Sequence, residues 1–526
     1  MISSLIRLVA LLGLAATTLP NLVLVQAQNS FAVRGYAINL RVDPVTKTIE
    51  GIVDAKLTIT SRSLNSITLD LAGALSVDSV KIGGLEVAFV HERDLLTVNL
   101  GGVCQAGSSV DVTIKYHGQP KGDGFSFGEH ASMPMVATYG LPFTAREWWP
   151  CVDLPTTKVT ALDLTVTVPE PLFVASNGRL VNQQSNGDGT RTFHWSVRYP
   201  IYPDTVSLAI TNYSSFSLPY IYPSGQMNMD FYVYPEDLEK AKTDFSSLPD
   251  MMKSHVSFFG EYPFIEEKYG IAEFSVNSFR EHQTLPSYGA ARITGDHRND
   301  FILAHELAHQ WFGNSISVKN WSHIWLNEGF ATYAYALWIE RRDGKAAYLV
   351  AMQKLDRKEF PGSVFINVPT ERDKLFSATT FYKGAWVLHM LRHVMGDKRF
   401  FRALKSYVRT FSYKNAATED FQRVCERSYG RSLAWFFHEW IYGMGRPRYA
   451  VSWHSSSRGR LDITVRQDQP NGVPFKMPLD LVLHTQTGER RIVIWTSKKS
   501  QAFSFLIAQS VTAIDLDPEG WVLKDS

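Results

Sequence analysis

The sequence predicts a multidomain α+β protein in which a β region, a mostly helical region and a small second β region follow one another. The chain has 526 residues, about three times the roughly 150 expected of one domain. Apolar and polar residues alternate up to about residue 212 and again after about 445, whereas between them apolar residues recur at helical spacing. Aromatic residues make up 13% of the chain, which favours packed globular domains over disorder.

Residues 1–27 have the pattern of a secretory signal peptide. Arg7 supplies a positive start, "LVALLGLAA" an apolar core, and "VQA" a small-residue cleavage site before Gln28. The alternative is a membrane anchor, but "TTLPN" interrupts the apolar run before the ~20 residues that a spanning helix needs. The pattern therefore predicts export to the periplasm or the extracellular medium, with no membrane span in the mature chain.

Three predicted domains follow the signal. Residues 28–212 contain alternating runs such as "IEGIVDAKLTITS" between turn residues, which is typical of β-strands. Residues 213–445 contain runs with apolar i, i+3, i+4 spacing, such as "NDFILAHELAHQWF" and "LNEGFATYAYALWIERR". Alternation returns in residues 446–526, for example in "RRIVIWTS".

Charge and cysteine content exclude several kinds of partner and site. The formal net charge is +2, and no basic run or stripe is visible, so no nucleic-acid partner is expected. Cys104, Cys151 and Cys425 lie far apart and form no CxxC pair. Neither a disulfide framework nor a thiolate zinc cluster is indicated.

The stretch "ILAHELAHQWFGN" predicts a metal site. His305 and His309 are four residues apart on a predicted helix, so both imidazoles lie on one face. Zinc favours imidazole nitrogen, and a catalytic zinc needs three protein ligands. Glu328, 19 residues beyond His309 and near the start of the next predicted helix, is the candidate third ligand. One Zn²⁺ per chain is expected, although such a site can also take cobalt or manganese.

The zinc-binding helix also has candidate ends and a candidate general base. Asn299 or Asp300 could cap its start, and Gly313 with Asn314 could end it. Glu306 follows His305 and is turned by ~100° from it, out of coordination but close to the attacking water. A carboxylate there can accept a proton from that water and pass it to the leaving amine.

Further motifs are spread over nearly the whole mature chain. They are "HELAHQWFGN" with "WLNEGFATY", "AREWWPCVDLP", "VASNGRL", "REHQTLPSYG", "YKGAWVLHMLR" and "FFHEWIYGMGRPRY". With these motifs the sequence resembles the aminopeptidase N family of gluzincin (HEXXH-x18-E) zinc metallopeptidases. The resemblance implies an N-terminal β saddle, a thermolysin-like catalytic domain and a small C-terminal β sandwich. It implies the short three-domain form, since the sequence ends after the last β segment.

The resemblance also implies roles for particular residues. His305, His309 and Glu328 match the zinc ligands of the family, and Glu306 matches its general base. Glu281 matches the glutamate that binds the free α-amine of the substrate. A carboxylate suits that role, because a buried ammonium needs a paired counter-charge.

The sequence departs from the family pattern in three ways. Ser278, Phe279 and Arg280 stand where the family has small residues and Met before the amine-binding glutamate. Phe279 and Arg280 would crowd the substrate path, and Arg280 could compete for that carboxylate. Leu141 stands where the family often has a second amine-binding Glu or Gln. Phe381 matches the transition-state tyrosine, and Tyr382, one residue late, is the candidate replacement. A shift of one residue turns a helical side chain by ~100°.

Three functions remain open on this evidence. The first is a secreted zinc peptidase, an aminopeptidase acting on small peptides. The second is a zinc peptidase that does not require a free N-terminus, because only one amine anchor remains. The third is a zinc-holding protein of weak activity that binds peptides. The sequence does not distinguish oligomeric states or the preferred N-terminal residue.

Overall fold

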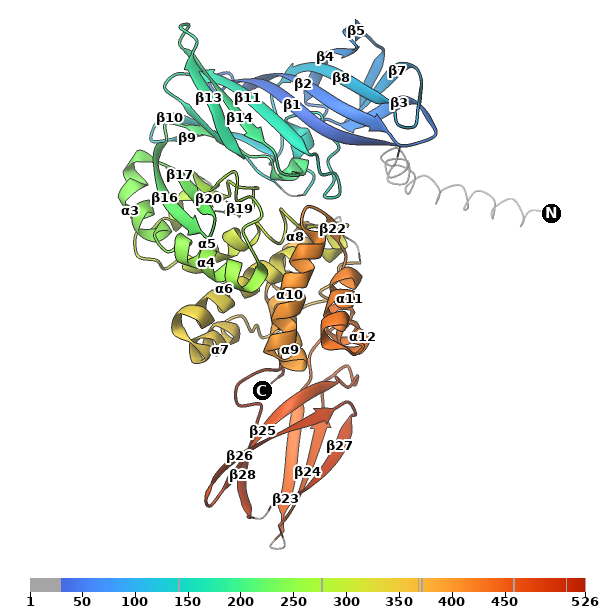
Figure 1. Cartoon of the computed structure of the whole chain (residues 1–526), viewed down its shortest axis with the longest axis vertical. Helices are drawn as coiled ribbons and strands as arrows, with labels where there is room; N and C mark the ends of the chain where they lie inside the picture. Colours follow the sequence, from blue (N-terminus) through green and yellow to red (C-terminus); the bar gives the residue numbers. More distant parts are fainter. Residues whose placement is uncertain are drawn as a thin grey trace, which may run out of the picture. The chain divides into compact units, whose positions relative to one another are not determined.

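The computed structural model describes residues 30–140, 142–275, 278–367, 369, 372–456, 459–507 and 509–525. The chain divides into two compact units, one of Met1–Asp244 with Phe264–His297 and one of Phe245–Pro263 with Arg298–Ser526 (Figure 1). The multidomain α+β prediction is confirmed. The expected signal segment 1–27 and Leu141 lie outside the described residues, so the export prediction and the role of Leu141 stay predictions.

An eight-stranded sheet forms the largest part of the first unit. Its strand order is β13-β14-β11-β1-β2-β8-β4-β5, with β1 and β11 parallel and the other neighbours antiparallel. The strands are β1 (Phe31–Asp43), β2 (Thr48–Ile59), β4 (Leu75–Ile82), β5 (Leu85–Glu86), β8 (Ser109–Gly118), β11 (Ala161–Pro169), β13 (Arg179–Ser185) and β14 (Thr190–Val197). Every second residue of β2 is buried, so the predicted alternation corresponds to one face packed on the core.

Three smaller sheets complete the first unit. Their orders are β12-β15-β10-β9, β3-β7-β6 and β16-β17-β18-β20-β19. The first two comprise β12 (Phe173–Ser176), β15 (Leu208–Thr211), β10 (Met133–Thr138), β9 (Phe125–His130), β3 (Ser63–Asp70), β7 (Leu95–Gln105) and β6 (Phe89–Glu92). The third comprises β16 (Ser214–Tyr222), β17 (Gly225–Val233), β18 (Tyr269–Phe274), β20 (Ser287–Gly289) and β19 (Phe279–Arg280), and helix α3 (Leu238–Phe245) follows β17.

The second unit begins with helices. They are α4 (Leu248–Phe259), α5 (Asp300–Ala308), α6 (Trp325–Asp343), α7 (Lys345–Gln353), α8 (Arg372–Leu375), α9 (Gly384–Met395), α10 (Asp397–Phe411), α11 (Thr418–Tyr429) and α12 (Ala434–Phe437). Two π-helical turns, Thr379–Lys383 and His438–Tyr442, and a short parallel pair of strands, β21 (Ser317–Val318) and β22 (Asn415–Ala416), join them. Among the described helices, none has the length and apolar content needed to cross a bilayer.

Two three-stranded sheets end the second unit, as expected for a small β sandwich. Their orders are β23-β24-β27 and β26-β25-β28. The strands are β23 (Tyr449–Ser455), β24 (Arg460–Gln467), β27 (Ser500–Leu506), β26 (Gly488–Thr496), β25 (Met477–Thr485) and β28 (Val511–Leu516).

Beyond β28, Trp521 stacks on His389 of α9 at 4.6 Å between ring centroids, and His389 Nε2 lies 3.1 Å from the Gly520 carbonyl. These contacts fix the end of the chain to α9.

Helices α6 and α9 approach each other through two glycines. A Cβ on Gly329 would lie 2.9 Å from the carbonyl carbon of Gly384, and one on Gly384 would lie 3.0 Å from Gly329 Cα. Carbon atoms in ordinary contact are about 3.5–4.0 Å apart, so neither position accepts a side chain at this spacing. The close packing matters for the site, because Gly329 follows Glu328 and Gly384 follows the turn that carries Phe381.

Candidate metal centre

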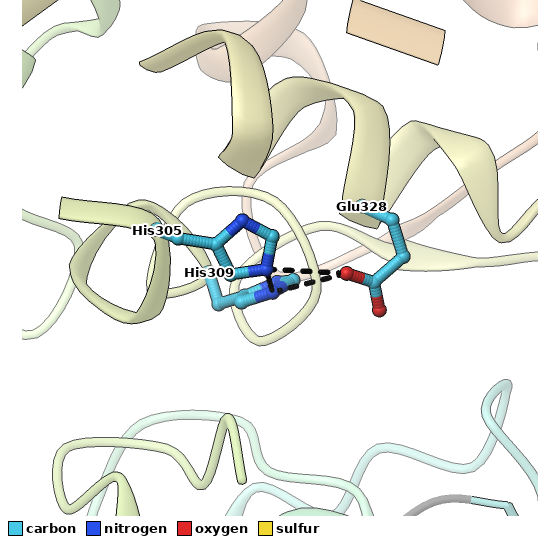
Figure 2. Close-up of side chains that lie close together, drawn as sticks. All are labelled: His305, His309 and Glu328. Atoms are coloured by element: carbon cyan, nitrogen blue, oxygen red, sulfur yellow. Dashed lines mark hydrogen bonds and ion pairs between the residues drawn. The ribbon is translucent and has the colours of Figure 1, made fainter. Parts of the chain in front are cut away.

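Three side chains converge on one point in the second unit (Figure 2). His305 comes from the last turn of α5, His309 directly follows that helix, and Glu328 lies in the first turn of α6. The two Nε2 atoms are 2.9 Å apart. Glu328 Oε2 lies 3.3 Å from His305 Nε2 and 3.4 Å from His309 Nε2. The structure thus brings the three predicted ligands together.

This arrangement fits a zinc ion. Bonds of about 2.0–2.1 Å at tetrahedral angles place two donor atoms about 3.3 Å apart, close to the separations found here. Nitrogen and carboxylate donors are also the types that zinc prefers. Three protein ligands of this kind are typical of catalytic rather than structural zinc sites.

Both imidazoles are oriented by contacts at their other ring nitrogen. His309 Nδ1 lies 3.0 Å from the carbonyl oxygen of Phe312, and His305 Nδ1 lies 3.4 Å from Thr332 Oγ1 in α6. A proton on each Nδ1 can be donated to these oxygens, which leaves each Nε2 lone pair for a metal. The sequence analysis did not identify either partner.

The zinc-binding helix is shorter than predicted. It begins at Asp300 after Asn299, as expected, but it ends at Ala308 rather than near Gly313. The backbone turns back after His309, so that Asn314 N donates to the His309 carbonyl oxygen at 3.0 Å. This turn also brings the Phe312 carbonyl oxygen to His309 Nδ1. The early end of the helix is therefore part of how His309 is held.

Burial and neighbouring charge favour the ionisation states that a metal binds. Burial, with His309 nearby, lowers the pKa of His305, which keeps the imidazole neutral. Burial alone would raise the pKa of Glu328, but His309 and His305 outweigh it and hold that pKa at about 2. Neutral imidazole and ionised carboxylate are the ligating forms.

Glu306 is buried and lies on α5 directly after His305. Its side chain leaves the helix about 100° from that of His305, as the sequence analysis expected of a residue beside the ligands rather than among them. Removing a carboxylate from water costs free energy, and here the buried carboxylate lies next in sequence to a metal ligand.

Phe381 and Tyr382 have different neighbours. The Phe381 ring stacks on the His305 imidazole, with centroids 5.8 Å apart and planes inclined by 25°. The Tyr382 ring has the Arg357 guanidinium 4.2 Å above it. Of the two, Phe381 therefore borders the metal centre through a direct ring contact. Arg357 lies in the irregular segment after α7, where no pattern in the sequence indicated this contact.

Glu281 is buried in the first unit, directly after β19. The segment that carries it is held by Asn177, whose Nδ2 donates to the carbonyl oxygens of Gln283 and Thr205. The neighbouring Arg280 lies over the Tyr139 ring at 4.8 Å, in addition to donating to two oxygens of its own segment. The motif "VASNGRL" thus has a structural task, because its Asn177 positions the backbone next to Glu281.

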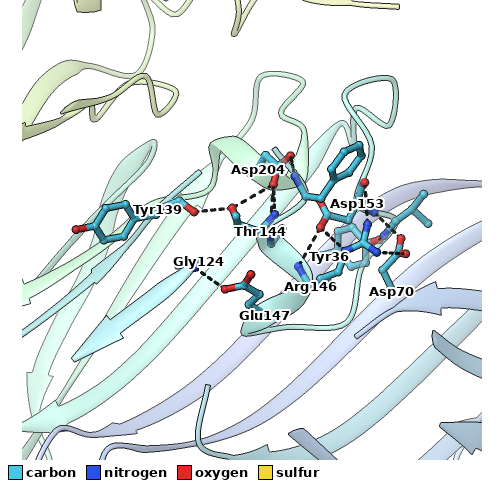
Figure 3. Close-up of polar contacts among 12 residues, drawn as sticks. Tyr36, Asp70, Gly124, Tyr139, Thr144, Arg146, Glu147, Asp153 and Asp204 are labelled. Atoms are coloured by element: carbon cyan, nitrogen blue, oxygen red, sulfur yellow. Dashed lines mark hydrogen bonds and ion pairs between the residues drawn. The ribbon is translucent and has the colours of Figure 1, made fainter. Parts of the chain in front are cut away.

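A buried polar network fixes the "AREWWPCVDLP" segment of the first unit (Figure 3). Asp204 accepts hydrogen bonds from the backbone nitrogen of Ala145, the first residue of the segment, at 3.2 Å and from that of the preceding Thr144 at 3.0 Å. Arg146 pairs with Asp153 at 2.8 Å and with Asp70 at 3.0 Å. Burial, together with Asp204, raises the pKa of Asp153 to about 8. The polar residues of this motif therefore stabilise the fold of the first unit.

The second unit contains a mononuclear metal centre of the HEXXH type, with two histidines, one glutamate and an adjacent buried glutamate. Comparison with models of known protein families gives the same class of protein. Residues 269–440 match the model of the peptidase family M1 domain, and residues 33–202 match that of the peptidase M1 N-terminal domain. The chain belongs to peptidase family M1, the family to which aminopeptidase N-like enzymes belong.

Named relatives and solved structures are consistent with this assignment. The chain is 26% identical to aminopeptidase M1-D of Oryza sativa subsp. japonica, over 83% of this chain and 52% of the relative. It is 24% identical to the puromycin-sensitive aminopeptidase of Caenorhabditis elegans, over 89% of this chain and 53% of the relative. The chain thus spans about half the length of these curated relatives.

Two solved structures have a similar fold. An M1 zinc metallopeptidase from Deinococcus radiodurans is 25% identical, with a TM-score of 0.70 over 80% of this chain and 95% of that one. Aminopeptidase A of Legionella pneumophila, solved with aspartic acid, is 17% identical, with a TM-score of 0.82 over 94% of this chain and 60% of that one. The second likeness concerns the fold alone.

Proposed function

We propose that this protein is a zinc-dependent metallopeptidase, an aminopeptidase that removes N-terminal residues from peptides. The observation that carries the proposal is the convergence of His305, His309 and Glu328 in a chain of peptidase family M1. Glu306 lies on the same helix as His305. Relatives named as aminopeptidases support the choice of reaction.

The residues of the metal centre have different roles in the proposed hydrolysis. A bound Zn²⁺ supplies Lewis acidity, which lowers the pKa of water and polarises a carbonyl group. His305, His309 and Glu328 would hold the ion. A carboxylate oxygen of Glu306 accepts the proton of the attacking water and later delivers it to the departing amine nitrogen. Phe381 contributes an apolar surface beside His305 and cannot donate a hydrogen bond.

Glu281 is proposed as the group that binds the free α-amine of the substrate. Its match to the amine-binding glutamate of the family and its burial support this role. A carboxylate held on a fixed backbone segment can pair with an ammonium without further ordering. Tyr382 is the alternative candidate for a catalytic hydroxyl, although its ring lies against the Arg357 guanidinium.

Paired substrates test the proposal. The protein and its Glu306→Gln variant would be incubated with tripeptides in free and N-acetylated forms, with different N-terminal residues, and products identified by mass spectrometry. We expect loss of the first residue from the free peptides only. Glu306→Gln should lose at least ~10² in rate while keeping its zinc, because an amide accepts no proton.

The same assay separates the alternatives. Equal cleavage of free and acetylated peptides would favour a zinc peptidase that needs no free N-terminus. Absence of cleavage by zinc-loaded protein would favour a peptide-binding protein of weak activity.

The cellular location of the protein is a second proposal. The N-terminal pattern around Arg7 supports export, and we therefore propose a location in the periplasm or outside the cell. Fractionation of the source cells, followed by sequencing of the mature N-terminus, tests this. A mature chain starting at Gln28 is expected, and a cytoplasmic protein that retains its first residues would contradict it.

A further inference from the structure

A groove of about 740 Å³ lies in the second unit between the end of α4, α10 and α11. Its lining includes three buried apolar side chains, Phe259, Val408 and Val424. None of its lining residues is a metal ligand or Glu306. The groove is therefore separate from the metal centre, and the proposed hydrolysis does not account for it.

Positive charge is concentrated along this groove. Four exposed cations line it, Arg402, Lys405, Arg409 and Arg427, against one carboxylate, Glu261. Within the described part of the chain, the side chains of these four cations have no ion pair or hydrogen bond. The whole chain carries a net charge of only +2, so three unbalanced charges at one place are a local feature.

The cations form a stripe that the sequence analysis did not find. Arg402, Lys405 and Arg409 are not adjacent in sequence, but i, i+3 and i+7 spacing places them on one face of α10. The opposite face of α10 is buried. The expectation that the chain has no basic stripe is therefore wrong for this helix, because the stripe forms only at helical spacing.

The shape of the stripe suits an extended acidic peptide. Seven residues of helix span about 10 Å, more than one phosphate group can contact at once. In an extended peptide, side chains on the same side repeat about every 6.8 Å, so alternate carboxylates can follow the stripe. Apolar side chains between them can face the aliphatic stems of these cations, together with the small exposed parts of Val408 and Val424. Nucleic acid fits less well, since Phe259 is the only aromatic residue in the lining and is 1% exposed, leaving no stacking surface.

We propose that the groove between α4, α10 and α11 is a binding site for an extended acidic peptide segment in which carboxylates alternate with apolar residues. The site binds by charge pairing along α10 and by burial of apolar side chains against the lining. It is independent of the metal and of hydrolysis.

Fluorescence anisotropy with a blocked peptide tests the site. The probe is fluorescein-labelled Glu-Leu-Glu-Leu-Glu with an acetylated N-terminus and an amidated C-terminus, so it lacks a free α-amine. The groove variant carries Arg402→Gln, Lys405→Gln and Arg409→Gln. The control variant carries Arg490→Gln, Lys498→Gln and Lys499→Gln, which removes the same charge from exposed side chains of the C-terminal strands and turns. Thermal unfolding verifies that both variants fold.

The groove variant should bind the probe at least about tenfold more weakly, the sum of three modest exposed charge pairs. The control variant should change binding less than about twofold, and Gln-Leu-Gln-Leu-Gln should not bind. Equal weakening in both variants, or no binding by the wild type at low salt, would overturn the proposal. Tighter binding of a twelve-residue oligothymidylate than of the peptide would overturn the choice of a peptide ligand.

Discussion

The phenyl ring of Phe381 stacks on the imidazole of His305, 5.8 Å away between centroids. A tyrosine hydroxyl aimed at a developing oxyanion acts only in the transition state, and such a donor typically contributes ~10² to 10³ in kcat. Phe381 fills space beside the ligand but donates nothing. Phe381→Tyr should therefore raise kcat by about tenfold or more with KM little changed, as measured by steady-state kinetics on free peptides.

Tyr382→Phe is the matched control for that prediction. The Tyr382 ring faces Arg357, so loss of its hydroxyl should leave kcat nearly unchanged. If Tyr382→Phe abolished activity while Phe381→Tyr had no effect, Tyr382 would be the catalytic tyrosine and the assignment of Phe381 would be wrong.

The close packing of Gly329 on Gly384 should stabilise the metal centre. Gly329→Ala would place a methyl group within 2.9 Å of a backbone atom of α9, so α6 and α9 must separate. Overpacking of this kind costs about 1–3 kcal/mol of unfolding free energy. Urea unfolding should show this loss, and zinc analysis should show weaker retention, because Glu328 moves with α6.

Gly102, where an added Cβ meets open space, provides the control for a glycine-to-alanine substitution. A Cβ on Gly102 would meet nothing within 4 Å. Gly102→Ala should leave stability and zinc content unchanged. Wild-type stability and zinc content in Gly329→Ala would show that the two helices tolerate wider spacing.

Thr332 should increase zinc affinity by orienting the His305 imidazole. Its hydroxyl oxygen lies 3.4 Å from His305 Nδ1, and losing such an orienting partner typically costs 10–100-fold in metal affinity. Thr332→Val, which keeps the side-chain shape, should weaken zinc binding by about tenfold in competition with a chelating dye. Thr332→Ser should restore it. An unchanged affinity in Thr332→Val would mean that packing alone orients His305.

Glu281→Ala tests recognition of the α-amine. Unpairing a buried charge costs several kcal/mol, so kcat/KM on free peptides should fall steeply. Any residual hydrolysis of N-acetylated peptides should not change. Equal losses on both substrates would show that Glu281 supports its loop rather than binding the amine.

Features set by local spacing could be predicted from the sequence. His305 and His309 lie four residues apart, and one helical turn between them brings their imidazoles to the same face. The alternation in β2 likewise predicted a strand with one buried face. Glu328 was predicted from its position in the chain and from the family resemblance, and the structure brings it to the two histidines.

Features that depend on the tertiary fold could not be predicted. Gly313 suggested a helix end, but α5 ends at Ala308 because the following turn brings Phe312 to His309. The contact of Gly329 with Gly384 joins helices 55 residues apart, and nothing local marks it.

Zinc content is the most direct test of the proposed enzyme. Mass spectrometry of purified, folded protein should find about one zinc per chain, and His309→Ala should lose it, because two ligands cannot hold a catalytic-type site. His454→Ala, at a histidine on β23, should keep its zinc. A well-folded wild type without zinc, or His309→Ala with one zinc per chain, would contradict the metal centre and with it the peptidase.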